Sequence, residues 1–210
     1  QMESYVDSTA LPNGRFCPFT GHESAVGGII PGGDSVFPIY NCPSSTMPAV
    51  VPANLTWGNV SGGDSAMIGY ATTDYKGAGG SARGDFGMLH KQAEVPGGRA
   101  LRDCTDGLSN TITVGESSYI RGGDWPTWVG GINTDEAMRF NGRTSAPING
   151  FTTTNNMAGA ISDDCAFSFH TGGAQFVFGD GSVHFITENI DLAIWSNLND
   201  LSDGVPLGEF

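Results

Sequence analysis

A histidine and an aspartate near the C-terminus are the first candidates for a catalytic role in this sequence. A histidine that is oriented by a carboxylate can act as a general base. His170 is followed by nine residues and then by Asp180 and Gly181. If residues 174–178 form a strand, a rise of about 3.3 Å per residue places Asp180 about 20 Å from the bend at 171–173. The two side chains then lie at opposite ends of one strand, which favours a structural role over a catalytic dyad.

Other signatures of catalysis are missing from the sequence. The chain contains no G-x-S-x-G, H-E-x-x-H or S-x-x-K pattern. His22, His90 and His184 are isolated, which is more typical of surface or core histidines than of ligands. We therefore predict no catalytic residues and a protein that is not an enzyme.

Oxygen-bearing side chains gather in one short stretch, which contains Asp103, Asp106, Ser109 and Asn110. Calcium takes six to eight oxygen ligands, so this stretch is a candidate calcium site, and calcium is the candidate cofactor. The EF-hand spacing is absent. The alternative is that Asp106 and Gly107 form a tight turn while the Ser109 and Asn110 side chains cap the backbone.

The four cysteines are far apart and form no C-x-x-C pair, which disfavours zinc ribbons and thioredoxin-like motifs. An even number of cysteines in an acidic, glycine-rich chain with few lysines favours two disulfides in an exported protein. Pairing the cysteines nearest in sequence gives Cys17–Cys42 and Cys104–Cys165. Four buried thiols in a cytosolic protein are the alternative.

The clearest local pattern is a β-hairpin near the C-terminus. Residues 174–178 and 183–186 flank an Asp-Gly pair that is typical of a two-residue turn. Such a turn places Phe176 opposite Phe185, and Phe178 opposite Val183. All four side chains are then expected to face one core.

Two further elements are expected around this hairpin. Residues 111–116 have an alternating pattern with β-branched side chains, which predicts a strand. Apolar residues at helical spacing over residues 189–198 predict a short helix, which Thr187 could cap. One helical candidate is too few for a doubly wound α/β fold. We predict a single domain over residues 1–210 of the α+β class, mainly antiparallel β with long loops.

Charge limits the partners of the chain. Nine Lys and Arg against 22 Asp and Glu give a net charge of −13. Nucleic acids and anionic membranes attract positive surfaces, so neither is expected as a partner. Aromatic side chains that stack on sugars remain a candidate binding feature, and they would come from Trp57, Trp125 and Trp128.

Three segments together resemble a large bacterial family of prepilin-type proteins that carry an H-X9-DG domain, whose function is largely undefined. The segments are Asn41–Ser44 (NCPS), residues 105–112 (TDGLSNTI) followed by Glu116, and residues 169–183 around the His and Asp-Gly pair. Their order and spacing match those of the family across about residues 40–190, which is most of the chain. The matching motif residues are Cys42, Asp106, Gly107, Ser109, Asn110, Glu116, His170, Asp180 and Gly181.

The resemblance implies a pilin-like head domain. Family members typically begin with a prepilin leader and a long hydrophobic helix, and the start at Gln1 fits an exported head without that helix. The implied function is an extracytoplasmic structural or interaction module at the cell surface or secreted, the soluble head of a type IV pilin-like or secretion pseudopilin-like protein. Other pilin-like subunits or surface and secretion components are the implied partners, with no direct membrane contact by this part. Calcium orders a C-terminal loop in some pilin-like relatives. The alternative is an extracellular carbohydrate-binding module.

Overall fold

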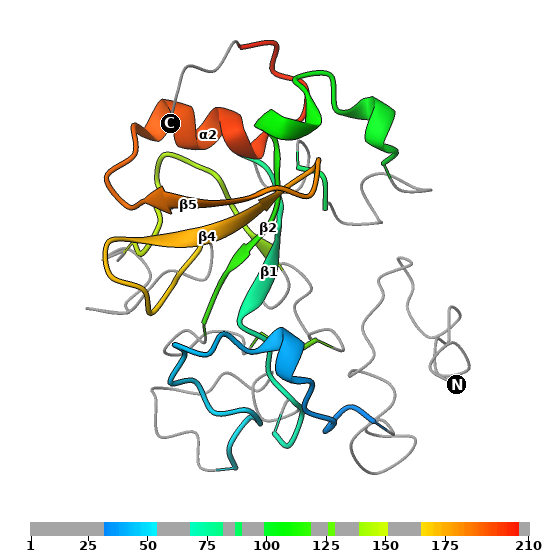
Figure 1. Cartoon of the computed structure of the whole chain (residues 1–210), viewed down its shortest axis with the longest axis vertical. Helices are drawn as coiled ribbons and strands as arrows, with labels where there is room; N and C mark the ends of the chain where they lie inside the picture. The colour runs from blue at the N-terminus through cyan, green and yellow to red at the C-terminus, as the bar shows by residue number, and fades with distance from the viewer. Residues whose placement is uncertain are drawn as a thin grey trace.

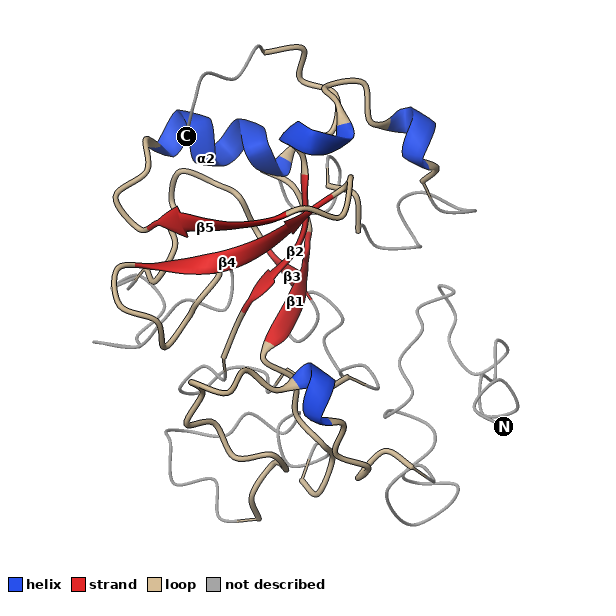
Figure 2. Cartoon of the chain, viewed as in Figure 1, coloured by secondary structure: helices blue, strands red, loops and turns tan. Residues whose placement is uncertain are grey.

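A five-stranded mixed sheet lies at the centre of the computed structural model (Figures 1 and 2). The structure describes residues 32–53, 68–81, 87–89, 99–118, 126–128, 139–150 and 165–205. The sheet order is β3-β1-β2-β4-β5. Strands β1 and β3 are parallel, and the other neighbouring pairs are antiparallel. The strands are β1 (Tyr75–Ala78), β2 (Ile112–Glu116), β3 (Arg139–Phe140), β4 (Gly173–Phe178) and β5 (Val183–Thr187).

Helix α2 (Leu192–Asn199) lies across one side of this sheet (Figure 1). Its N-terminus is capped by Asp191, whose carboxylate accepts the backbone N–H groups of Ala193 and Ile194 at 2.8 and 3.3 Å. The helix expected over residues 189–198 is therefore confirmed, but Asp191 rather than Thr187 supplies the cap. Among the described residues, no helix combines the length and the apolar character needed to cross a bilayer.

Short 3₁₀-helices occupy the connections, at Pro38–Tyr40 (η2), Leu101–Asp103 (η4) and Leu108–Asn110 (η5). The described part of the chain is thus mostly β-structure with long loops, as predicted. The strand expected over residues 111–116 is also confirmed, as β2.

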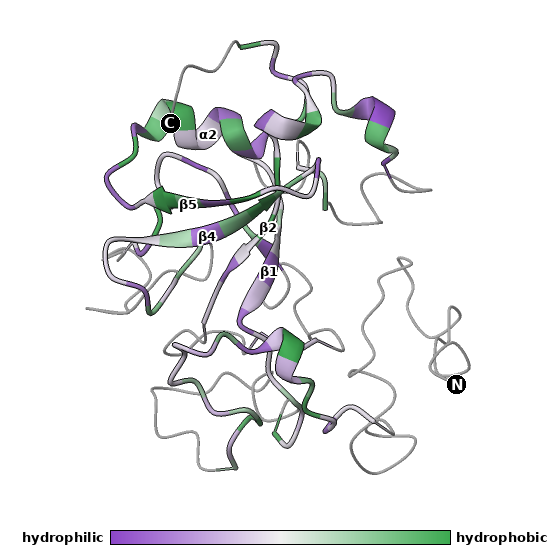
Figure 3. Ribbon diagram, viewed as in Figure 1, coloured by the Kyte–Doolittle hydropathy of each residue, from purple (hydrophilic) through white to green (hydrophobic). Residues whose placement is uncertain are grey.

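The hydrophobic core lies between α2 and the sheet. Trp195 of α2 stacks on Phe140, with ring centroids 6.0 Å apart, and meets the ring of Phe176 edge to face at 5.3 Å. The indole N–H of Trp195 donates to the backbone oxygen of Ala146 at 3.0 Å, so this buried polar atom is satisfied. Figure 3 shows hydrophobic residues on α2 and on the end of β4 that leads into the hairpin turn, whereas β1 is mostly hydrophilic. The core residues are Ala78, Ile112, Phe140, Ile148, Ala166, Ala174, Phe176, Phe178, Ile186, Trp195 and Leu198.

The C-terminal hairpin is present, but the expected register is wrong. Val177 pairs with Val183, and Phe176 pairs with His184. The N–H of Gly181 donates to the backbone oxygen of Phe178 at 3.0 Å, and Gly181 has a φ of +87°. The turn therefore has three residues and ends in a left-handed glycine, rather than the two-residue turn expected from Asp-Gly.

This extra turn residue reverses the faces of β5 relative to the prediction. A shift of one residue exchanges the two faces of a strand. Phe176 and Phe178 are buried, as predicted, whereas Val183 is 60 % and Phe185 is 49 % exposed. Ile186 provides the buried side chain of β5 instead.

The expected disulfides are also wrong. Cys42, Cys104 and Cys165 are thiols rather than disulfide partners, and Cys17 lies outside the described residues. The Cys104 thiol instead donates to the hydroxyl oxygen of Thr111 at 3.1 Å, and the Cys42 sulfur faces His170. Nearness in sequence was a poor guide because the fold directs the Cys42 and Cys104 thiols toward His170 and Thr111.

The observed register makes a direct stability test available. Phe176→Ala should lower the free energy of unfolding by about 3–5 kcal/mol, because it leaves a cavity under Trp195. Val183→Ala should change it by about 0.5 kcal/mol or less, as expected for an exposed side chain. Urea unfolding of both variants measures the difference. A cost for Val183→Ala above about 1.5 kcal/mol would indicate that this side chain is buried and that the register is wrong.

Candidate functional site

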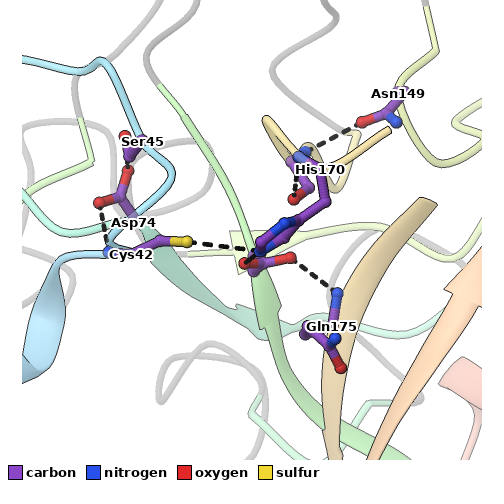
Figure 4. Close-up of polar contacts among 8 residues, drawn as sticks. Cys42, Ser45, Asp74, Asn149, His170 and Gln175 are labelled. Carbon is purple, nitrogen blue, oxygen red and sulfur yellow. Dashed lines mark hydrogen bonds and ion pairs between the residues drawn. The ribbon is translucent and has the colours of Figure 1, made fainter. Parts of the chain in front are cut away.

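Three side chains from segments far apart in the sequence converge at one end of the sheet: Cys42, Glu116 and His170. Cys42 follows the short helix η2, Glu116 ends β2, and His170 lies in the turn that leads into β4. Cys42 Sγ is 3.6 Å from His170 Nε2, and Glu116 Oε1 is 3.3 Å from the same nitrogen. One ligand atom from each residue lies within 4.8 Å of the other two. Figure 4 shows the His170 ring pointing toward the Cys42 sulfur.

Glu116 is the most deeply buried member of this cluster, with a side chain only 4 % exposed. A carboxylate in such a place needs hydrogen-bond donors, since burying it unpaired is costly. Its Oε2 accepts the backbone N–H of Gln175 at 2.7 Å, and its backbone oxygen accepts the N–H of Phe167 at 3.0 Å. Glu116 therefore holds the start of β4 and the segment before His170 against β2.

Cys42 is held from the opposite side by Asp74, which immediately precedes β1. The Cys42 N–H donates to Asp74 Oδ2 at 2.8 Å, and the Ser45 hydroxyl donates to Oδ1 at 2.6 Å. Asp74 and Ser45 lie on the far side of Cys42 from His170 (Figure 4). These bonds fasten the loop at residues 41–45 to the entry of β1.

His170 is held through its own backbone and is the cluster's most accessible member. Its side chain is 34 % exposed. Its N–H donates to the Ser168 hydroxyl at 3.1 Å, and the N–H of Ser168 donates to Asn149 Oδ1 at 2.9 Å. The turn that carries the imidazole is therefore fixed before any ligand binds.

The surroundings of the cluster favour a cation. Burial raises the pKa of the Cys42 thiol above its usual value, and the nearby carboxylates of Glu116 and Asp74 raise it further. Burial is also the main reason that the pKa of Asp74 is raised. The pKa of the Tyr75 hydroxyl is raised first by burial and then by Cys42, Glu116 and Asp74. Burial disfavours the anionic form of each of these three groups, and the Glu116 carboxylate disfavours it further. A positive charge placed among them would stabilise the anionic forms.

A family model matches residues 7–193 and carries the description "Protein of unknown function (DUF1559)". The chain belongs to the DUF1559 family. No curated protein and no solved structure matches it. Since the matched range contains Cys42, Glu116 and His170, the cluster is built entirely from the part of the chain that defines this DUF1559 domain.

Asp180 takes no part in the cluster. Strand β4 separates it from His170, as the spacing predicted. Asp180 Oδ1 accepts the N–H and the hydroxyl of Ser182 at 2.9 and 2.7 Å, within the hairpin turn. The H-X9-DG spacing is therefore the length of one strand plus its turn.

The acidic stretch considered for calcium is arranged as backbone caps. Asp103 Oδ2 accepts the N–H of Ala100 at 2.7 Å. The two oxygens of Asp106 accept the N–H groups of Asp203 and Gly204 at 2.6 and 2.9 Å. These bonds fasten the stretch after α2 to the η5 turn.

The rest of this stretch also serves the turn. Asn110 Nδ2 donates to the Asp106 backbone oxygen at 3.0 Å, Ser109 is exposed, and Gly107 has a φ of +97°. Within the described residues, the cluster of Cys, His, Asp or Glu side chains that could hold a metal ion is the one formed by Cys42, Glu116 and His170. It contains neither Asp103 nor Asp106. Calcium binding at this turn stays a prediction.

The sequence patterns pointed to all three residues of the cluster but did not show that they lie together in the fold. Cys42 was assigned to a disulfide, Glu116 was treated as part of a motif on a strand, and His170 was compared with Asp180. Asp74 was missed altogether, because no motif surrounds it. The signal that could have found the site is that each of the three segments that carry the resemblance contains at least one residue able to ligate a metal.

Asp180 offers a pH-dependent test of the turn. The hydroxyl and backbone N–H of Ser182 lower the pKa of Asp180 below its usual value. A carboxyl group with a lowered folded-state pKa adds stability above its unfolded pKa of about 3.9, and this stability is lost as the pH falls below that value. Asp180→Asn should therefore be less stable than the wild type at about pH 7, and the difference should shrink at about pH 2.5. Thermal melts at both pH values measure it, and a difference that is independent of pH would contradict the role given to the charge.

Proposed function

We propose that this DUF1559 domain is an extracytoplasmic structural and interaction module, the head of a pilin-like surface or secretion-apparatus protein. The observation that carries the proposal is that the residues of the resembling motifs hold the fold together through hydrogen bonds. Glu116 and Asp106 accept backbone N–H groups from distant segments, and Asp180 holds its own hairpin turn. These residues fasten a loop-rich fold, and this role supports an architectural function more than a catalytic one.

The architecture supports the same proposal. A small sheet covered on one side by α2, with long connecting loops, suits an α+β head whose loops face outward. The charge of −13 keeps such a domain soluble at high local concentration, because like-charged copies repel.

An exposed apolar surface supports a role in interaction. Ile39 is 80 % exposed, and its neighbours Val36, Phe37 and Tyr40 are also exposed. Phe37 and Tyr40 contact Trp128 with ring centroids 5.1 and 6.2 Å apart. We call Phe37, Tyr40 and Trp128 the aromatic cluster.

Labelling in intact cells tests the location. Ile39→Cys, introduced into the complete natural gene product, places a reactive thiol at the most exposed apolar position given above. A membrane-impermeant maleimide should label this variant as fully in intact cells as after lysis. The wild type is the matched control for the native thiols, and labelling of Ile39→Cys only after lysis would contradict an extracytoplasmic location.

Carbohydrate binding is the second candidate, and the aromatic cluster is the observation that favours it. Aromatic rings with exposed faces stack on sugars, and Trp128 is held in place by a hydrogen bond from its indole N–H to the Ser35 backbone oxygen at 3.0 Å. Trp57 and Trp125 lie outside the described residues.

Fluorescence titration tests this candidate. Oligosaccharides should change the tryptophan emission of the wild type and of Leu101→Ala, which alters an exposed side chain elsewhere, but not that of Tyr40→Ala. An unchanged emission in the wild type would contradict the carbohydrate candidate.

A further inference from the structure

We propose that Cys42, Glu116 and His170 bind one zinc ion, through Cys42 Sγ, Glu116 Oε1 and His170 Nε2. The inference concerns a ligand of the domain and does not depend on where the protein functions. It rests on the types of the three ligand atoms, their separations, their support by surrounding hydrogen bonds and their accessibility.

The separations match those of zinc ligands. Zinc lies about 2.3 Å from a cysteine sulfur, about 2.0–2.1 Å from an imidazole nitrogen and about 2.0–2.2 Å from a carboxylate oxygen. With tetrahedral angles, these lengths place the sulfur about 3.6 Å from the nitrogen, and the nitrogen about 3.3–3.5 Å from the oxygen. The structure has 3.6 Å between Cys42 Sγ and His170 Nε2, and 3.3 Å between His170 Nε2 and Glu116 Oε1.

Direct hydrogen bonding satisfies only part of this cluster. A bond of 3.3 Å between the imidazole and Glu116 is at the long end of the range for N–H···O bonds. His170 Nε2 also faces two groups at once and carries at most one proton. A cation placed between the three atoms satisfies all of them together.

Hydrogen bonds hold the Glu116 carboxylate and the backbones of Cys42 and His170 in place. Groups around a metal site orient its ligands through hydrogen bonds to their remaining atoms. The second oxygen of Glu116 accepts the Gln175 N–H, the Cys42 backbone is held by Asp74, and the His170 backbone is held by Ser168. Each ligand is therefore fixed by a bond that leaves its metal-facing atom available.

The ligand types select a transition metal. A thiolate and an imidazole suit zinc better than calcium or magnesium, which prefer oxygen ligands. Three protein ligands leave a fourth tetrahedral position, and the partly exposed His170 places that position next to solvent. A water molecule is the fourth ligand that this arrangement admits.

Metal titration of the full chain, stripped with a chelator and kept reduced, tests the proposal. Zinc should bind with a stoichiometry of one ion per chain by calorimetry and should raise the melting temperature. Cobalt, used as a spectroscopic substitute, should give the absorption bands of a tetrahedral ion and a sulfur-to-cobalt charge-transfer band.

Matched variants assign the ligands. Cys42→Ser should abolish the charge-transfer band, while Cys104→Ser, which retains a donor to Thr111, should keep it. His170→Gln should weaken zinc binding about tenfold or more, as loss of even a supporting group does. His184→Gln, a change to an exposed histidine on β5, should bind as the wild type does.

The outcomes separate clearly. Absence of zinc binding to the wild type overturns the proposal, and so does a charge-transfer band that persists in Cys42→Ser. Equal zinc affinity in His170→Gln and the wild type also overturns it. Circular dichroism checks the fold of each variant. If Cys42→Ser does not fold, alkylation of Cys42 in the wild type is measured instead. One equivalent of zinc should protect Cys42 from alkylation, and a lack of protection would overturn the proposal. Failure of zinc binding would leave the cell-labelling result unaffected.

Discussion

The described structure depends on satisfying one buried carboxylate. Glu116 ends β2 inside the protein, where an unpaired charge would be costly. The N–H of Gln175 near the start of β4 donates to this carboxylate, and the imidazole of His170 lies beside it. This requirement brings the turn before β4 against β2 and places His170 where it meets Cys42. The segment at residues 41–45 then closes over the site through Asp74 and the start of β1.

The elements of the fold were more predictable than the contacts between them. Short-range patterns located β2, the hairpin strands and α2, because each depends on the residues within it. The hairpin register was not predictable from Asp180 and Gly181 alone. A two-residue and a three-residue turn can both use this pair, and the choice depends on whether Gly179 also leaves the strand. That single residue decided that Ile186, rather than Phe185, reaches the core.

The site was also only partly predictable, because it depends on contacts between segments that are far apart in the sequence. Motif spacing identified His170, Glu116 and Cys42 as important, and strand length correctly separated His170 from Asp180. Their convergence joins positions 128 residues apart, from Cys42 to His170, and spacing along the chain carries no information about such a contact. The same reason explains the wrong disulfide assignments, since cysteines were paired by sequence distance. It also explains why Asp74, which has no motif of its own, was found only in the fold.

The central claim is that Cys42, Glu116 and His170 form one energetically coupled site. A double-mutant cycle between Glu116→Gln and His170→Ala in metal-free protein tests it most directly, because glutamine can still accept the Gln175 N–H while losing its charge toward the imidazole. The account predicts a coupling free energy of about 0.5 kcal/mol or more by urea unfolding. Glu116→Gln combined with Asp180→Asn, at the far end of β4, should be additive. Additivity between Glu116 and His170 as well would contradict the claim.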